Sequence, residues 1–287
     1  MKTSRAGFLE RFVRKSCGAC LFLFILVNIA LSSGVRTTPP IIFCDNTQKS
    51  VHVTITNPGD NSLEVWFDFK YGYSTINDSG KILVVTPETL QSDDRSAATW
   101  IKAFPQRFIL GPQETQVVRM VVSPPTDIGD GEYWSRVIIS SKDQQLPFVK
   151  GATSLGASFI VISANSVPFH YRFRSNVTGL QLSRSIEFQN TGKNFEISVP
   201  LHRTGNASYW GTLTCKLINS TGKQIFTQQY NLAVYKDFVY PIKIDKSNIP
   251  SGDYTLELTA KAERSDVQRL FLTRSEPVTW ILPVKIQ

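Results

Sequence analysis

The sequence predicts an all-β protein built from two tandem immunoglobulin-like β-sandwiches. Runs of alternating apolar and polar residues, such as residues 51–57, recur with turn signals about every 8–12 residues, the pattern of sandwich strands. No run combines a helical apolar repeat with capping signals. A corner pattern also occurs twice, as DIGDGEYW at residues 127–134 and as NIPSGDYT at residues 248–255. The two tyrosines lie 254 − 133 = 121 residues apart, close to the length of one sandwich domain.

The predicted strands follow one another along each half of the chain. Residues 51–57 and 63–69 flank an Asn-Pro-Gly loop, and residues 107–123 hold two strands around the turn Gly111-Pro112. We expect Trp66 to lie in the first core. Further strands are expected at residues 133–141 and 156–163 in the first half, and at 185–203, 210–232, 238–244, 253–263 and 278–287 in the second.

The first 33 residues have the pattern of a secretory signal peptide. Five basic residues precede the apolar run 21–31, and small residues follow it. The run is shorter than the roughly 20 residues that a membrane span needs, and Asn28 interrupts it. An uncleaved membrane anchor is the alternative. We therefore predict a signal peptide at residues 1–33, an N-terminal sandwich at 38–165 and a C-terminal sandwich at 166–287, with no stable membrane insertion after cleavage.

The net charge gives little support for a polyanionic partner. Removing five basic and one acidic residue with the signal lowers the formal charge from +8 to +4 (8 − 5 + 1). Aromatic and basic side chains alternate in FHYRFR, residues 169–174, but three basic residues are too few for a nucleic-acid site. We expect this stretch to be a charged strand edge near the join between the domains, and we expect no nucleic-acid partner.

The repeated tyrosines have a structural interpretation. In sandwiches of this kind, a tyrosine near the start of a late strand turns its hydroxyl back to the backbone a few residues upstream. Tyr133 and Tyr254 each follow a glycine that gives the turn conformational freedom. We predict that both form such corners.

The two cysteines outside the signal, Cys44 and Cys215, fall in different halves of the chain. We therefore expect no immunoglobulin-type bridge within a domain. Buried thiols are the prediction, and a bridge between the domains is the alternative.

The sequence shows no catalytic set. There is no nucleophile elbow and no phosphate loop, and the three histidines stand apart from any other metal-ligand residue. Acidic pairs in loops are interpreted as turn formers, with a calcium site as the alternative. We therefore expect no catalytic residue, no metal and no cofactor, and a binding or structural role. Four glycosylation sequons occur, at Asn77, Asn176, Asn206 and Asn219.

Three stretches resemble the PapD-like periplasmic chaperones of pilus assembly. IIFCDNTQKSVHVTITNPGDNSLEVWF, residues 41–67, is similar to the first strands of that family. FPQRFILGPQETQVVRMVV, residues 104–122, and GASFIVISANSVPFHYR, residues 156–172, are similar to later parts of its first domain. The resemblance covers about residues 38–174, and the second domain shares only the general sandwich pattern.

The resemblance implies a function without enzyme activity. Chaperones of this family lend the last strand of their first domain to an incomplete subunit, without ATP, by β-strand addition. The matching residues are Phe159, Val161 and Ser163, with Ile160 and Ile162 on the opposite face. An ordinary core strand would show the same alternation. The implied partners are subunits of a pilus or another surface fibre and an outer-membrane usher, and the implied location is the periplasm.

The sequence departs from the family at the group that holds the subunit's terminal carboxylate. The two basic positions of the family fall near Pro40 and on Pro168, and proline cannot donate a hydrogen bond. Arg36, Lys150 and Arg172 are candidate replacements, although Arg172 better matches an arginine that serves the domain join. The alternative function is a secreted or surface-exposed adhesin, carbohydrate-binding protein or structural spacer.

Overall fold

A computed structural model describes residues 34–144 and 160–287 of the chain. The predicted signal peptide, Lys150 and Phe159 lie outside these residues. Within the described residues, no helix is long and apolar enough to cross a membrane.

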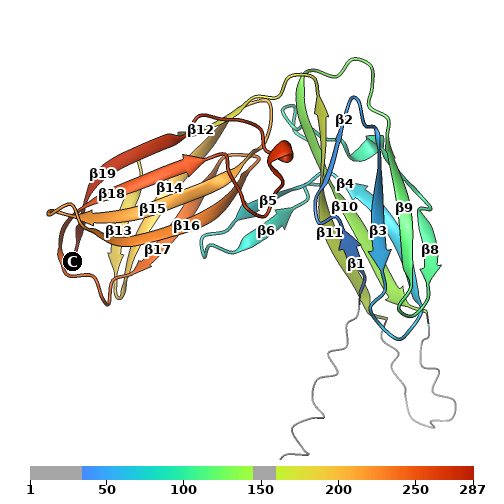
Figure 1. The fold of residues 1–287 in the computed structure, drawn as a ribbon, viewed down its shortest axis with the longest axis horizontal. Coiled ribbons are helices and arrows are strands. Elements are labelled where there is room, and N and C mark those ends of the chain that lie inside the picture. The colour runs from blue at the N-terminus through green and yellow to red at the C-terminus, as the bar shows by residue number, and fades with distance from the viewer. Residues whose placement is uncertain (1–33, 145–159) are drawn as a thin grey trace, which may run out of the picture.

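The first domain is a sandwich of two sheets (Figure 1). The four-stranded sheet has the order β1 (Arg36–Thr38), β3 (Ser50–Thr56), β9 (Thr115–Val122) and β7 (Ile101–Phe104). The five-stranded sheet has the order β2 (Ile42–Asp45), β11 (Ile162–Phe173), β10 (Gly131–Asp143), β4 (Leu63–Lys70) and β8 (Arg107–Leu110).

The second domain is also a sandwich of two sheets (Figure 1). One sheet has the order β12 (Thr178–Leu182), β14 (Asn194–Gly205) and β13 (Glu187–Thr191), with β17 (Phe238–Asp245) also paired to β14. The other has the order β16 (Gln224–Val234), β15 (Tyr209–Asn219), β18 (Gly252–Lys261) and β19 (Val278–Ile286). The predicted all-β architecture of two tandem sandwiches is confirmed.

Each domain has a core of its own, formed by the inward face of its strands. In β3, Val53 and Ile55 are fully buried, while Thr54 between them is half-buried and His52 before them is exposed, as the alternation predicts. Burial of such an apolar side chain contributes about 1.5–3 kcal/mol to the stability of the fold. The prediction that Trp66 lies in the first core is wrong. Trp66 is half-buried on the outer face of β4, beneath the guanidinium of Arg107. Its neighbours along the strand take the inward positions.

Both described cysteines are free and buried, as predicted. Burial raises the pKa of each thiol to about 12, with the charge of Asp45 adding to the effect at Cys44. The two thiols are therefore packing groups and not reactive ones.

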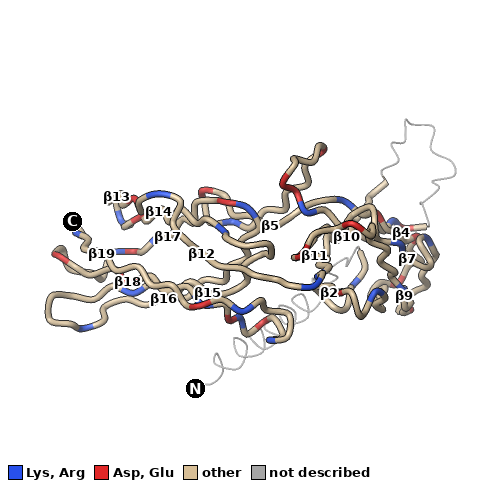
Figure 2. Tube along the Cα trace, turned by 90° about the horizontal axis from the view of Figure 1, so that it is seen from above, with Lys and Arg blue, Asp and Glu red and all other residues tan. Residues whose placement is uncertain are grey.

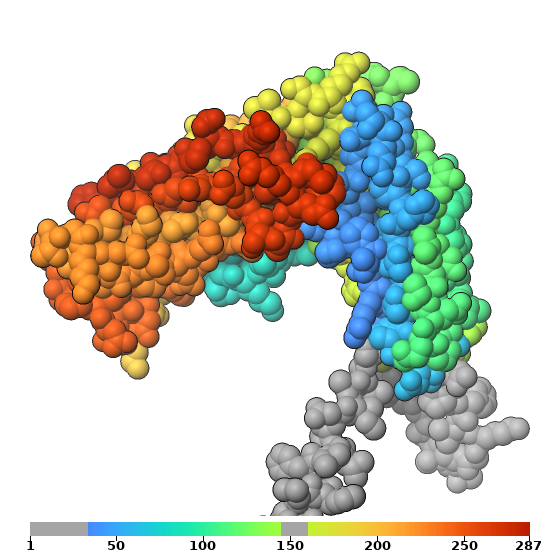
Figure 3. Space-filling view, viewed as in Figure 1, coloured from blue at the N-terminus to red at the C-terminus, as the bar shows by residue number. Residues whose placement is uncertain are grey.

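Strand β11 extends across the predicted boundary between the domains. It remains paired with β10 in register from Lys142↔Ile162 to Gly131↔Phe173. The predicted join at residues 165 and 166 therefore falls inside a strand of the first sandwich. Figures 1 and 3 show that the two sandwiches meet at an angle and leave an open crook between them.

A small hairpin, which the sequence did not indicate, projects from the first domain toward the second. It consists of β5 (Tyr73–Ile76) and β6 (Ile82–Val85), and it follows β4 directly. Two short 3-10 helices, η1 (Ala98–Trp100) and η2 (Arg269–Phe271), complete the described elements.

Two of the four sequons are explained by turn geometry. Asn77 closes the β5–β6 turn and Asn219 closes the β15–β16 turn in the same way. In each, the asparagine Oδ1 accepts hydrogen bonds from the backbone N–H groups two and four residues later. Gly80 and Gly222 then both have φ of 80°, which favours glycine. The Asn-x-Ser/Thr-Gly-Lys pattern is a turn signal in this chain.

Both predicted corners are formed. The Tyr133 hydroxyl donates to the Gly129 carbonyl at 2.9 Å, and the Tyr254 hydroxyl donates to the Pro250 carbonyl at 2.6 Å. Each bond spans four residues and ties the end of a crossover to the strand that follows it. The side chain of Tyr254 is more buried than the side chain of Tyr133.

Replacing Tyr254 with phenylalanine removes one corner bond and keeps the ring. We expect Tyr254→Phe to lower the free energy of unfolding by roughly 1–2 kcal/mol, because the Pro250 carbonyl loses its partner. Tyr133→Phe should cost less, because its bond is exposed. Urea unfolding of the purified protein measures both.

The matched control is Tyr209→Phe in the same domain. The Tyr209 hydroxyl is buried, and it has no hydrogen-bond partner among the described residues. Its removal should leave the free energy of unfolding unchanged or raise it. Equal effects of Tyr209→Phe and Tyr254→Phe would contradict the corner interpretation.

Candidate functional site

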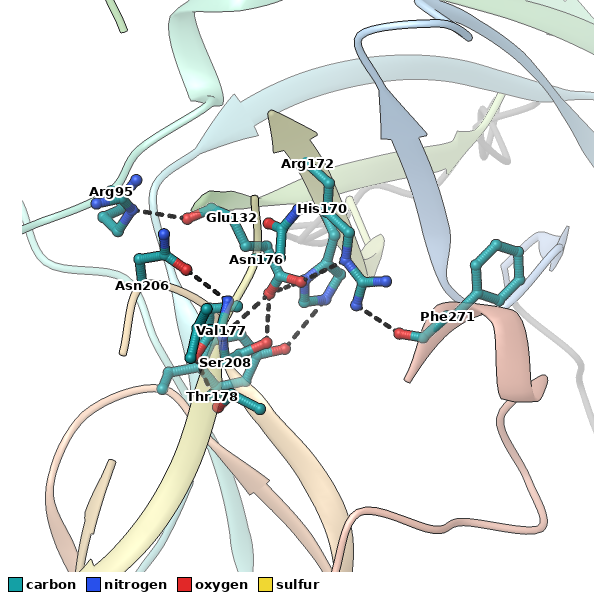
Figure 4. A network of polar contacts seen from close by, with 12 residues as sticks. Arg95, Glu132, His170, Arg172, Asn176, Val177, Thr178, Asn206, Ser208 and Phe271 are labelled. Atoms are coloured by element: carbon teal, nitrogen blue, oxygen red, sulfur yellow. Dashed lines mark hydrogen bonds and ion pairs between the residues drawn. The ribbon is translucent and has the colours of Figure 1, made fainter. Parts of the chain in front are cut away.

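A buried carboxylate lies where the two domains meet. Glu132 of β10 is fully buried, and the antiparallel register places it opposite Arg172 of β11. Arg172 Nε donates to Glu132 Oε2 at 2.9 Å, and His170 Nδ1 lies 2.9 Å from Glu132 Oε1. The hydroxyl of Ser208, from the second domain, also donates to Oε1 (Figure 4). One carboxylate therefore joins two strands of the first domain to the second domain.

The charged form of Glu132 is strongly favoured. Burial by itself would raise the pKa, because it removes water from the carboxylate. His170, Arg172 and the Ser208 hydroxyl outweigh this effect and lower the pKa from its usual 4.5 to about 2. Because an ionised carboxylate only accepts hydrogen bonds, His170 donates from Nδ1.

The other side of His170 also contacts the second domain. Its Nε2 lies 3.2 Å from the hydroxyl of Tyr235. Phe43 of β2 stacks on His170, with ring centroids 4.8 Å apart, and on Phe271, with centroids 4.3 Å apart. Arg172 donates to the Phe271 carbonyl as well. The expected charged edge at residues 169–174 is thus partly wrong: His170 is fully buried, and its partners hold the domains together.

The outer side of β11 is paired with another strand over only part of its length. Strand β2 pairs with it in parallel, but only from Phe169 to Arg172. Among the described residues, no strand pairs with this side between Ile162 and Pro168. This part of β11 therefore has no strand paired to its outer side, although Asn165 Nδ2 donates to the Val35 carbonyl and Gly34 lies next to Ser163.

Apolar side chains lead into this edge. Ile160, Val161 and Ile162 are 60%, 66% and 56% exposed. Three consecutive exposed apolar residues at a sheet edge are unusual, because proteins normally protect such edges with charge or proline. Ser163 is half-buried and shares the inward face of β11 with Val167.

The direction of the backbone groups along the edge follows from neighbouring bonds. Trp134 N–H donates to the Arg95 carbonyl, and the Trp134 carbonyl accepts from Ala97, so both groups point away from β11. Trp134 faces His170 in the register, and this pair is therefore a non-hydrogen-bonded one. By alternation, so is the pair Ile138↔Ser166. The N–H and C=O of Ser166 hence point outward, at the open edge.

Arg136 reaches this edge from the neighbouring strand. Its Nε donates to Ser166 Oγ at 2.9 Å and its Nη2 to the Ser166 carbonyl at 3.0 Å. The residue is 4% exposed, and its Nη1 has no hydrogen-bond partner among the described residues. Burial lowers its pKa, yet an arginine stays charged. A buried guanidinium that forms no ion pair with a described carboxylate is suited to receive an anion.

Arg136 was not among the site residues predicted from the sequence. The available signal was an arginine in the middle of YWSRVIISS, a run whose other residues are compatible with burial. Of the predicted anchors, Arg172 is bound to Glu132, and Lys150 lies outside the described residues. Arg36 is exposed on β1, in the other sheet, where it pairs with Thr56.

The described residues offer little else for chemistry. They contain no group of three metal-binding side chains. A pocket of about 510 Å³ near the base of the hairpin has a mixed lining of residues such as Tyr71, Pro87, Glu88 and Leu90. Figure 2 shows basic and acidic residues interspersed along both domains, without a large patch of one sign in that view.

No known family model matches the chain, and no curated protein matches it. Among solved structures, it is similar to the chaperone–tip adhesion subunit complex CsuC–CsuE of Acinetobacter baumannii, with 14% identity, 87% of this chain and 98% of that chain covered, and a TM-score of 0.42. It is also similar to the Escherichia coli chaperone DraB, with 13% identity, 78% and 91% coverage and a TM-score of 0.36. The Pseudomonas aeruginosa chaperone CupB2 has 8% identity, 86% and 98% coverage and a TM-score of 0.38. All three structures contain a chaperone, the class of protein that the three sequence stretches resemble. Because the sequence identities and TM-scores are low, the function of this chain is inferred from its own contacts.

The Glu132 cluster predicts how stability depends on pH. Because folding lowers the pKa of Glu132 to about 2, its stabilisation is present above pH 4.5 and is lost as the pH falls toward 2. This lowering of the Glu132 pKa corresponds to roughly 3 kcal/mol in the free energy of unfolding. Urea unfolding between pH 7 and pH 2 should show that Glu132→Gln lacks this part of the pH dependence.

A surface carboxylate provides the control. Glu196 forms a partly exposed pair with Lys243 at 3.3 Å, so Glu196→Gln should keep the pH dependence of the wild type. If Glu132→Gln also keeps it, the buried carboxylate does not stabilise the domain join.

Proposed function

We propose that the protein is a divergent PapD-like chaperone that binds subunits of a pilus or another surface fibre by β-strand donation. The observation that carries the proposal is the open edge of β11, which the exposed residues Ile160, Val161 and Ile162 extend. An incomplete β-sandwich subunit lacks a strand, and this edge offers one. We also propose that the protein acts in the periplasm after loss of residues 1–33, and that an outer-membrane usher receives the subunit.

The energetics of strand addition fit this edge. Outward backbone groups, such as the N–H of Ser166, supply hydrogen bonds that do not depend on the subunit's sequence. The apolar side chains that the sequence alternation groups as Phe159 with Val161 and Ile160 with Ile162 fill the groove of the incomplete subunit. The subunit's later folding around its own missing strand then drives release, so ATP is not needed.

We further propose that Arg136 holds the terminal carboxylate of the subunit. Strand β2 takes the edge from Phe169 onward, and Pro168 offers no N–H, so an added strand must end beside Ser166. The guanidinium of Arg136 lies at that position. A strand that runs parallel to β11 would place its carboxyl terminus there. This assignment replaces Arg36, Lys150 and Arg172 as the leading anchor.

Charged side chains in the donor segment should abolish subunit binding. We expect Phe159→Asp plus Val161→Asp to reduce subunit recovery about tenfold or more, because the subunit's apolar groove cannot accept carboxylates. Tagged protein is purified from the periplasm of the organism that encodes it, and the partner is identified by mass spectrometry.

The control variant is Ile281→Asp in β19, because Ile281 is 65% exposed and Val161 is 66% exposed. It should keep wild-type recovery of the subunit. The proposed function is wrong if the double variant stays folded by circular dichroism and retains every partner, or if the partner is not a fibre subunit.

Arg136 is tested with a peptide that matches the carboxyl-terminal strand of the recovered subunit. Wild-type protein should bind the free-acid peptide about 10–100-fold more tightly than the amidated one, the scale of hydrogen bonds to a charged group. Arg136→Met should remove this preference and leave the fold stable, because an apolar residue of similar size replaces a buried charge. Isothermal titration measures both affinities.

Arg36→Met is the matched comparison, since Arg36 is exposed on another sheet. It should retain the preference for the free acid. If Arg136→Met keeps the preference for the free-acid peptide and Arg36→Met loses it, Arg36 is the residue that binds the terminal carboxylate.

A further inference from the structure

The β5–β6 hairpin uses one strand for the domain join and leaves the other outside it. Tyr73 of β5 contacts the ring of Tyr235 with centroids 6.2 Å apart, and Ile76 packs against the core of the second domain. The apolar residues Ile82, Leu83 and Val84 of β6 are 69%, 41% and 43% exposed. The domain join explains the residues of β5 and does not explain those of β6.

Strand β6 has the properties of a docking surface. Its residues ILVV carry no charge, and it pairs with β5 on one side alone among the described residues. A short apolar edge of this kind favours association unless a partner covers it. The contacts of β5 hold the hairpin against the second domain, so the surface is formed before any partner arrives.

The side chain of Arg136 lies between the base of the hairpin and the outer edge of β11. Gly72 immediately precedes β5, and a Cβ at that position would lie 2.9 Å from Arg136 Cγ and 2.7 Å from the Val85 carbonyl oxygen. A glycine is therefore required for this approach. The other end of Arg136 binds Ser166 at the open edge. The same arginine thus connects both surfaces.

The two surfaces also share one side of the molecule. Figures 1 and 3 show the hairpin beneath the second domain, beside the crook that borders the first domain. A subunit whose strand ends at Arg136 has its body beside Gly72 and the hairpin. This continuity favours the bound subunit as the occupant over an unrelated partner or a second copy of this chain.

We propose that β6 is a second binding surface for the subunit that the β11 edge holds, with Ile82, Leu83 and Val84 against an apolar face of that subunit. The inference rests on the proposed function. Such a contact makes binding bipartite: the edge recognises the missing strand, and the hairpin recognises the body of the same subunit.

Site-specific photocrosslinking in the intact periplasm tests this proposal. p-Benzoylphenylalanine is placed at Leu83, at Val161 or at Ile281, and crosslinked partners are identified by mass spectrometry. We expect Leu83 and Val161 to trap the same subunit and Ile281 to trap none. In addition, Ile82→Ser plus Val84→Ser should weaken the Val161 adduct about tenfold while the melting temperature stays unchanged, because two apolar contacts are lost.

The outcomes separate this inference from the proposed function. A Val161 adduct without a Leu83 adduct overturns the inference alone, and so does a Leu83 adduct that contains a second copy of this chain or any other protein. An unchanged Val161 adduct in the double serine variant also overturns it. Absence of a subunit from the Val161 adduct overturns the proposed function and the inference with it.

Discussion

The arrangement of the two domains depends on one buried carboxylate, that of Glu132. A carboxylate without water is costly unless hydrogen bonds and opposite charge compensate for its lost hydration. Here His170 and Arg172 of β11 are joined by Ser208 of the second domain, so the second domain contributes one of the hydrogen bonds that stabilise the charge. Phe43 and Phe271 close the site with stacked rings and keep water out.

The cluster also determines what β11 can offer to a partner. One end of the strand, from Phe169 onward, is occupied by β2 and by the domain join. The other end, from Ile162 to Pro168, has no strand paired to its outer side among the described residues. A strand that is anchored firmly at one end and open at the other suits donation, because little conformational entropy remains to be lost on binding. Rigidity at the join and openness at the edge are thus two properties of one strand.

Much of the fold could be predicted because it depends on local patterns. The alternation in residues 51–57 predicted which side chains of β3 enter the core, and the two glycine-tyrosine corners predicted two domains. The hairpin was missed because its strands of four residues each are too short to show a period. The predicted join at residues 165 and 166 fell within β11, because an alternating run does not reveal where a strand leaves its sheet.

The sequence by itself determined the fold class and the number of sandwiches, since strand periodicity and turn residues act over a few positions. Only the tertiary structure decided which charges are buried and which edges stay open. His170 and Arg136 looked like surface residues in a line of sequence, yet cross-strand register places one against Glu132 and the other at the Ser166 edge. Such pairings join residues 30 or more positions apart, and no local pattern encodes them.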